Sequence, residues 1–456
     1  MLEIGLKKNE IQEAVITGYS SEGSGICRIA NTVVFVPGTI AGEKWRIRIV
    51  KVNQSEAYGR AEELLEGSPE RIEPDCAAYP KCGGCALRHM TYAEELRFKL
   101  QHVNDCLTRL GGQMVTADEI LGSECTEAYR DKGIYEFAEK DGRVVCGFYH
   151  RRSHDIIPVS DCQLQKELAN RAANALLDFL QQKNISAYNE MTGKGTVRHL
   201  FCRSAVHTKD VVVCIVSADG FGANTSLLVE SMRDACPELT GIVLNINRGQ
   251  GNAVLAGDFY TLWGKPEIED TLCGLKFSIS PRSFFQINPA QTERLYAKAV
   301  EYAFPEDGGL ALDLYCGTGT ISLCIARHAA KVIGAEIIPE AVENARSNAM
   351  ENHIDNTEFI CADAGKAAAE MAAREVRPNV IVIDPPRKGI SEETASAILT
   401  MAPDRIVYVS CNPATLARDI KRLSEDGYVL QKAAAVDMFP RTYHVETVCL
   451  MSRKEK

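Results

Sequence analysis

The chain has 456 residues, of which 45% are hydrophobic and 25% charged, as is ordinary for a soluble globular protein. Its length predicts two to four domains. The formal net charge of −10 disfavours a nucleic acid as the partner, although binding depends on local patches rather than on the average charge. The sequence has no apolar run long enough for a membrane span and no apolar signal core at its N-terminus. We therefore expect a cytoplasmic protein without a membrane partner.

The N-terminal segment, residues 8–67, alternates short apolar stretches with turns. Five stretches predict a small β-barrel, namely 13–19, 25–29, 32–36, 44–52 and 58–65. Arg46 and Arg48 alternate along one predicted strand and therefore share a face. With only Glu43 and Glu56 counted as opposing charges, we interpret this face as net basic and suited to RNA; a solvated strand face is the alternative. The segment resembles the TRAM domain, a small RNA-binding barrel attached to several RNA-modifying enzymes.

Three cysteines follow a proline-containing linker in the pattern C-x5-C-x2-C, which places Cys76, Cys82 and Cys85 on one glycine-rich loop. In a reducing compartment, clustered cysteines indicate metal binding or catalysis rather than disulfides. A fourth ligand is needed, and we choose Cys162 because it follows an apolar strand and begins a helix-like segment. The spacing differs from that of a structural zinc ribbon and favours a [4Fe–4S] cluster over zinc. Unrelated reduced cysteines are the remaining alternative.

Residues 68–278 are predicted to form a central α+β domain that carries this cysteine site. Apolar residues three and four apart predict helices over 91–110 and 164–182, and alternating patterns predict strands over 197–218 and 241–263. Asp141-Gly142 marks a hairpin within 130–160. The stretch from Phe148 to His154 mixes aromatic and basic residues that suit RNA, and a solvated hairpin edge is an equally good interpretation.

A strand, glycine-rich turn, helix, strand and acid follow one another from Leu310 to Glu336. The two glycines of Cys316-Gly317-Thr318-Gly319 let the backbone approach a ligand closely, and Glu336 is placed to accept hydrogen bonds from a ribose. A dinucleotide site would prefer glycine where Ser322 stands, and Asp313 suits a cationic ligand. We therefore favour S-adenosyl-L-methionine (SAM) over a dinucleotide; an ordinary βαβ unit is the alternative.

Strands and helices continue to alternate to the C-terminus, which predicts an α/β sheet whose ligands lie at the carboxyl ends of its strands. The residues expected at such ends are Tyr315, Gly317, Glu336, Asp363, Asp384 and Cys411. Asp384-Pro385-Pro386 is similar to the motif of amino-methyltransferases, but those enzymes carry an aromatic residue where this chain has Arg387. We therefore expect the chemistry at another residue, and Cys411 is the candidate.

Cys411 and Glu446 have the residue types that methylation of uracil at C5 requires. A thiolate that adds to C6 makes C5 able to attack the sulfonium methyl group, and a base must then remove the C5 proton. Glu446, in the stretch His444 to Thr447, is the candidate base. A salt-bridged strand carboxylate and a buried cysteine at a strand end are the structural alternatives.

Five motifs together resemble the RNA uracil-C5 methyltransferases: SFFQIN, DLYCGTGT, DPPRKG, VSCNP and HVET. With the TRAM-like barrel and the four cysteines, the chain is similar to the 23S rRNA type of this family. The resemblance implies a Rossmann-like SAM-dependent methyltransferase domain over residues 279–456, with Cys411 as nucleophile and Glu446 as base. It also implies SAM ligands at Gln286, Tyr315, Glu336, Asp363 and Asp384, and cluster ligands at Cys76, Cys82, Cys85 and Cys162. Tyr315 stands where some members have Phe, and either ring can pack on the ligand.

The function implied by this resemblance is methylation of a uridine in 23S rRNA to 5-methyluridine by a monomeric enzyme. Methylation of the T-loop of tRNA is the nearest alternative. A non-catalytic RNA-binding iron–sulfur protein is less favoured, because both Cys411 and Glu446 are present.

Overall fold

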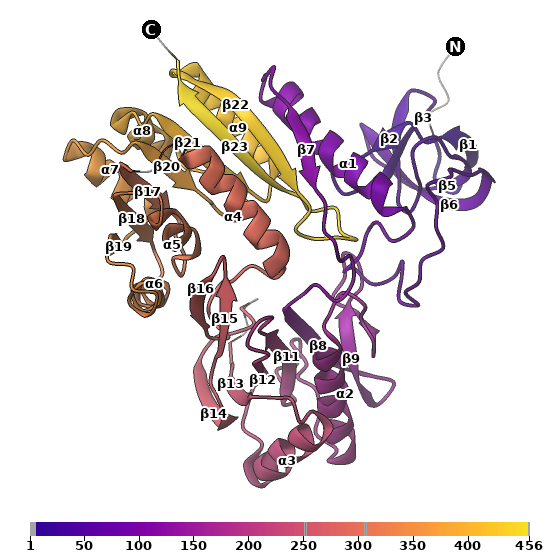
Figure 1. Cartoon of the computed structure of the whole chain (residues 1–456). Helices are drawn as coiled ribbons and strands as arrows, with labels where there is room; N and C mark the ends of the chain where they lie inside the picture. Colours follow the sequence, from indigo (N-terminus) through magenta and orange to yellow (C-terminus); the bar gives the residue numbers. More distant parts are fainter. Residues whose placement is uncertain (1–5, 250, 252, 305, 307, 455–456) are drawn as a thin grey trace.

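The computed structural model describes residues 6–249, 251, 253–304, 306 and 308–454. Figure 1 shows a curled N-terminal sheet, a central α+β part and a C-terminal α/β part, which confirms the predicted fold class. Within the described residues, no helix is long and apolar enough to cross a membrane.

The N-terminal part is a six-stranded sheet of order β1-β5-β6-β4-β3-β2 that curls until β1 contacts β3. Its strands are β1 (Ile11–Val15), β2 (Gly18–Tyr19), β3 (Gly25–Ile29), β4 (Thr32–Val36), β5 (Lys44–Val52) and β6 (Glu56–Glu66). Along β5, Ile47 and Ile49 point into the core while Arg46 and Arg48 point outward, as the period of two requires. The alternation predicted for this strand is therefore confirmed.

The central part is a seven-stranded sheet of order β10-β9-β8-β11-β12-β13-β14, antiparallel except between β12 and β13. Its strands are β8 (Lys132–Lys140), β9 (Arg143–Tyr149), β10 (Ile156–Pro158), β11 (Val197–Ser204), β12 (Val211–Ser217), β13 (Gly241–Ile246) and β14 (Asp258–Gly264). The helices α2 (Glu167–Gln182) and α3 (Thr225–Ala235) cover one face. The other face packs against the hairpin β15 (Ile268–Leu272) and β16 (Leu275–Ile279), which leads into the C-terminal part.

The C-terminal sheet has eight strands in the order β19-β18-β17-β20-β21-β23-β22-β7, and the first five are parallel. The strands are β17 (Leu310–Leu314), β18 (Lys331–Glu336), β19 (Thr357–Cys361), β20 (Val380–Ile383), β21 (Arg405–Ser410), β22 (Tyr428–Val436) and β23 (Glu446–Arg453), with β7 (Ala117–Leu121) at the edge. Chain order reverses between β17 and β20, and the carboxyl ends at such a switch point are where open α/β sheets bind ligands.

Helices cover both faces of this sheet. One face holds α4 (Pro289–Ala303), α5 (Thr320–Ala326) and α6 (Pro339–Glu351). The other holds α7 (Ala364–Ala373), α8 (Glu392–Met401), α9 (Pro413–Glu425) and the end of α1 (Tyr92–Asp105), which continues as a π-helical turn, Cys106–Leu110.

The predicted boundaries at residues 67/68 and 278/279 stay a proposal. β7 lies between the two N-terminal parts in sequence, yet it pairs in parallel with β22 of the C-terminal sheet. Figure 1 shows α1 and β7 beside β22 and β23. The C-terminal part is therefore completed by a segment from early in the chain.

Candidate active site and cysteine site

The glycine-rich turn after β17 is tied to the end of β18 by one carboxylate. The Gly317 amide donates to Glu336 Oε2 at 3.1 Å, and the Ile338 amide donates to Oε1 at 2.9 Å. Gly317 and Gly319 have φ of 56° and 82°, the left-handed region that glycine adopts without strain. A Cβ at Gly319 would lie 3.1 Å from Ala345 and 3.2 Å from the Phe359 ring, so this position also needs a small residue.

The buried Asp313 and the half-buried Asp384 lie at the switch point. The Ser322 hydroxyl donates to Asp313 Oδ2 at 2.5 Å, which gives a structural reason for the serine that departs from the dinucleotide pattern. Burial raises the pKa of Asp313 to about 7. Burial raises the pKa of Asp384 to about 7 as well, with a further contribution from the negative charge of Asp313. A bound cation would favour the ionised forms of both carboxyls.

Two of the other predicted SAM ligands have clear structural positions. Asp363 is the N-cap of α7, and its Oδ1 accepts from the amides of Gly365 at 3.0 Å and Lys366 at 3.3 Å. Gln286 is buried in the segment that leads into α4. Their binding of SAM stays a prediction.

Cys411 and Glu446 come from the ends of adjacent strands. β21 and β23 are antiparallel and pair Ser410 with Thr447, which places Cys411 next to Glu446 across the sheet. Glu446 is 3% exposed. Burial raises its pKa to about 8, with Asp384 contributing in the same direction and Arg387 opposing. Such a carboxyl is a candidate general base because its pKa lies close to neutral pH.

Arg387 faces the candidate nucleophile. Burial raises the pKa of Cys411 to about 11, and the charge of Glu446 raises it further, whereas the Arg387 guanidinium beside the thiol lowers it. Arg387 Nη2 also lies 3.5 Å from Nε2 of His444. Burial lowers the pKa of His444 to about 4, so this ring is neutral at pH 7. The sequence singled out Arg387 only because it replaces the aromatic residue of the amino-methyltransferase motif. Its partners Cys411 and His444 lie on other segments of the chain.

The four predicted cluster cysteines line one cavity of about 60 Å³. Cys76, Cys82 and Cys85 come from the loop before α1, and Cys162 from the segment before α2. Burial raises the pKa of Cys82 and Cys162, and that of Cys85 to about 12. Among the described residues, no three His, Cys, Asp or Glu side chains form a group that could hold a metal ion.

The arginines of the predicted basic face of β5 are ion-paired. Arg46 pairs with Glu63 and, at 3.2 Å, with Glu13, while Arg48 pairs with Glu62 at 2.6 Å. These glutamates stand on β1 and β6, the neighbours of β5 on either side, and offset part of the positive charge of the face, since Lys44 and Arg60 share Glu13 and Glu62.

A basic turn between β9 and β10 is the more open cationic surface. His150, Arg151 and Arg152 line two cavities of about 1320 Å³ and 560 Å³. The larger one is also lined by Phe35 and Tyr58 of the N-terminal sheet, whose ring centroids are 5.7 Å apart. This surface offers aromatic rings and cations together.

The fold and the acidic ligand edge define a Rossmann-like methyltransferase domain that follows an RNA-binding type of barrel. The family model described as tRNA (Uracil-5-)-methyltransferase matches residues 273–454, and that of the TRAM domain matches residues 5–62. An uncharacterized RNA methyltransferase of Clostridium tetani is 42% identical over 450 residues, which cover 99% of this chain and 98% of that protein. An uncharacterized RNA methyltransferase of Clostridium acetobutylicum is 42% identical over 456 residues, which cover 99% of this chain and 99% of that protein.

One solved structure is similar over nearly the whole chain. It is the Pyrococcus abyssi tRNA (uracil-54, C5)-methyltransferase in complex with S-adenosyl-L-homocysteine. The TM-score is 0.79 at 26% identity, covering 96% of this chain and 100% of that one. The chain belongs to the RNA uracil-C5 methyltransferase family.

Proposed function

We propose that the protein transfers the methyl group of SAM to C5 of a uridine in 23S rRNA through a covalent Cys411–C6 adduct. The products are 5-methyluridine, S-adenosyl-L-homocysteine and a proton. The observation that carries the proposal is the adjacency of Cys411 and Glu446 at the ends of β21 and β23, with Arg387 beside both.

The chemistry divides between a nucleophile and a base. The Cys411 thiolate adds to C6, the electron pair moves to C5, and C5 attacks the sulfonium methyl. Glu446 then removes the C5 proton, and the C5–C6 double bond reforms as the thiolate leaves. Arg387 favours the thiolate form of Cys411 because its charge lies beside the sulfur.

The switch point supplies the groups for SAM. Glu336 at the end of β18 is placed for the ribose, and Asp313 and Asp384 are placed to offset the positive charge of the cofactor. Gln286, Tyr315, Gly317 and Asp363 complete the proposed ligand set. The positive charge of bound SAM also lowers the pKa of nearby carboxyls. Its binding therefore favours the ionised form of Glu446, which is the form that a base requires.

The cysteine site is proposed to hold a [4Fe–4S] cluster. Four thiols line this one cavity and are the donor type of such a cluster, although their side chains do not form a metal-binding group in the described residues. Burial keeps the thiols of Cys82, Cys85 and Cys162 protonated unless positive charge is bound among them. We assign the cluster a structural role, because methyl transfer moves no single electrons.

The choice of 23S rRNA over tRNA rests on the barrel, the cysteine site and the resemblance of the motifs. tRNA is the second candidate, and the similarity to the Pyrococcus abyssi enzyme favours it. In either case we propose that a cytoplasmic monomer docks the RNA at the turn of Arg151 and Arg152.

Two experiments test the function. Mapping of 5-methyluridine in rRNA and tRNA from cells with and without the gene is expected to show loss of 5-methyluridine from 23S rRNA; a loss confined to tRNA would select the second candidate. With purified protein, Cys411→Ala should form no covalent RNA adduct, whereas Glu446→Gln should accumulate the methylated adduct as a slow band on a denaturing gel. An adduct formed by Cys411→Ala would refute the assignment of the nucleophile.

A further inference from the structure

The loop between β22 and β23, residues 437–445, ends at the candidate base. Its flanking residues Val436 and Glu446 are the last pair of the β22–β23 ladder. The loop also carries His444, which faces Arg387. The conformation of the loop therefore bears directly on the residue that follows it, Glu446.

Every backbone carbonyl from Asp437 to Arg441 accepts a hydrogen bond from another part of the chain. The donors are Gln291 Nε2 at 3.0 Å, Asn288 Nδ2 at 3.1 Å, Lys99 Nζ at 3.2 Å, Tyr129 Oη at 2.9 Å, and the amides of Ala86 at 2.9 Å and Leu87 at 3.1 Å. Because each of these five carbonyls has a hydrogen-bond partner elsewhere in the chain, this part of the loop is held in one conformation.

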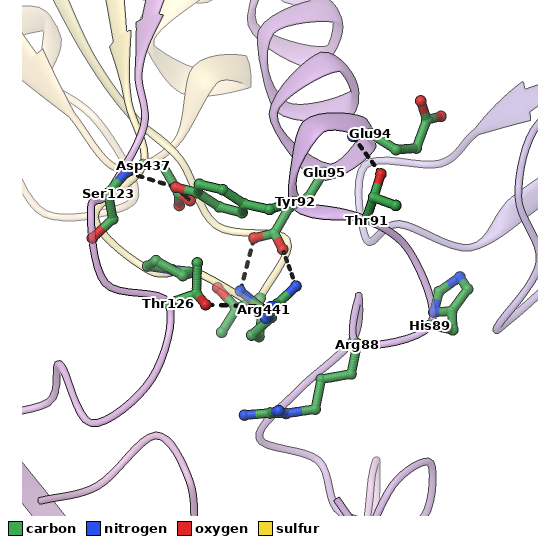
Figure 2. Close-up of polar contacts among 12 residues, drawn as sticks. Arg88, His89, Thr91, Tyr92, Glu94, Glu95, Ser123, Thr126, Asp437 and Arg441 are labelled. Carbon is green, nitrogen blue, oxygen red and sulfur yellow. Dashed lines mark hydrogen bonds and ion pairs between the residues drawn. The ribbon is translucent and has the colours of Figure 1, made fainter. Parts of the chain in front are cut away.

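Arg441 is the residue of this loop that meets the cysteine segment. It has φ of 69°, an unfavourable conformation for a residue with a side chain, which persists only where the surroundings impose it. Its amide donates to the buried Glu95 at 2.7 Å, and its carbonyl accepts from the two residues that follow Cys85. Figure 2 shows Arg441 held against Glu95 and Thr126, with Arg88 nearby.

Arg88 frames the cysteine cavity. Its side chain is 2% exposed and interacts with the Cys85 thiol. It donates to Asp75 at 2.5 Å and to Gln163 at 2.8 Å, the neighbours of Cys76 and Cys162 in the sequence. The same guanidinium contacts Glu127 at 2.5 Å, and the other oxygen of Glu127 accepts from Arg441 Nε at 3.4 Å.

We propose that Arg88, Glu127 and Arg441 form a relay through which the cysteine site positions Glu446, with Glu127 as a positioning residue. The inference rests on the proposed function and goes beyond it, because it gives the cysteine site a specific task. Ordering of the cysteine loop fixes Arg88 and the amides of Ala86 and Leu87. These groups fix Arg441, and the loop that follows presents the base.

The first test is hydrogen–deuterium exchange on the full chain, loaded with iron and sulfide or left metal-free. Metal-free protein should exchange faster both at residues 86–87 and at 438–446. Loaded Glu127→Ala should exchange faster only at 438–446. Glu124→Ala is the matched control, because Glu124 is exposed and makes no hydrogen bond or ion pair among the described residues. Equal exchange in the loop for loaded and metal-free protein, or for Glu127→Ala and its control, would overturn the relay.

The second test separates the base step from nucleophilic attack. RNA containing 5-fluorouridine traps the enzyme after methyl transfer, because fluorine cannot leave as a proton, so its trapping rate reports attack and methyl transfer without the base step. Glu127→Ala should be trapped within twofold of the wild-type rate, but on ordinary RNA it should release product about tenfold more slowly and accumulate adduct. Equal slowing of both steps would mean a merely structural role, and no slowing would also refute the relay. If the wild type itself is not trapped, the proposed function fails, whatever the exchange data show for the relay.

Discussion

Replacing Glu446 with glutamine should stabilise the SAM-free protein at neutral and alkaline pH. Burial raises the pKa of this carboxyl from its ordinary 4.5 to about 8, so the folded protein binds a proton that the unfolded chain has already released. Such a group contributes stability that is fully present below pH 4.5 and is lost as pH rises through 8. Glutamine keeps the shape and hydrogen-bonding capacity but has no charge to bury.

The expected gain grows with pH. At 1.36 kcal/mol per pH unit, the interval between 4.5 and 8 corresponds to about 5 kcal/mol at pH 8 and above, and to about 3 kcal/mol at pH 7. Near pH 4.5 the wild type and the variant should be equally stable. Asp384, whose charge contributes to the raised pKa of Glu446, makes the effect steepest above pH 7, where both carboxyls of the wild type ionise.

Urea unfolding at pH 5, 6, 7 and 8 without SAM measures this difference. Glu425→Gln provides a matched control, because Glu425 is exposed at the end of α9 in the same domain. A difference between Glu446→Gln and wild type that is the same at every pH, or a variant that is less stable at pH 8, would refute the reasoning. The Glu446→Gln variant should meanwhile lose turnover. The burial that destabilises the ionised carboxylate also gives Glu446 the raised pKa that suits a base.

Three further outcomes are expected. Anaerobically purified protein should be brown and contain about four irons per chain, and Cys162→Ser should lower the iron content; colourless protein with stoichiometric zinc would contradict the cluster. Arg151→Ala should weaken RNA binding and reduce its salt dependence in filter-binding assays, whereas Arg48→Ala and Arg152→Ala should do less because Glu62 and Glu22 already pair with these charges; the opposite ranking would refute the docking surface. Lys99→Met should lower the free energy of unfolding by about 3–5 kcal/mol in urea, because it removes the buried cation that pairs with both Glu95 and Asp437; a loss below about 1 kcal/mol would contradict this.

The local elements follow from residue patterns because period and turn chemistry act over a few residues. The strands predicted at 25–29, 32–36 and 44–52 coincide with β3, β4 and β5. The helix predicted over 91–110 does not continue as one α-helix, since its last turn is π-helical. The gathering of Glu336, Asp384 and Cys411 at one sheet edge was predictable, because parallel strands bring their carboxyl ends together.

Charges showed the limit of sequence reasoning. Glu62 and Glu63 are consecutive in the strand predicted beside Arg46 and Arg48, and a regular strand would turn them to opposite faces. The register shift between Arg46 and Ile47 in the β5–β6 pairing lets both pair with arginines, and no sequence pattern predicted this irregularity.

The sequence by itself determined the family motifs, the short strands and the order of chemical groups along the chain. Tertiary structure decided which groups meet: β7 beside β22, Arg387 beside Cys411, and Arg441 beside Ala86. It also decided the pKa of Glu446, because desolvation depends on every atom packed around the carboxyl. Those atoms come from segments hundreds of residues apart, and no local pattern specifies their distances.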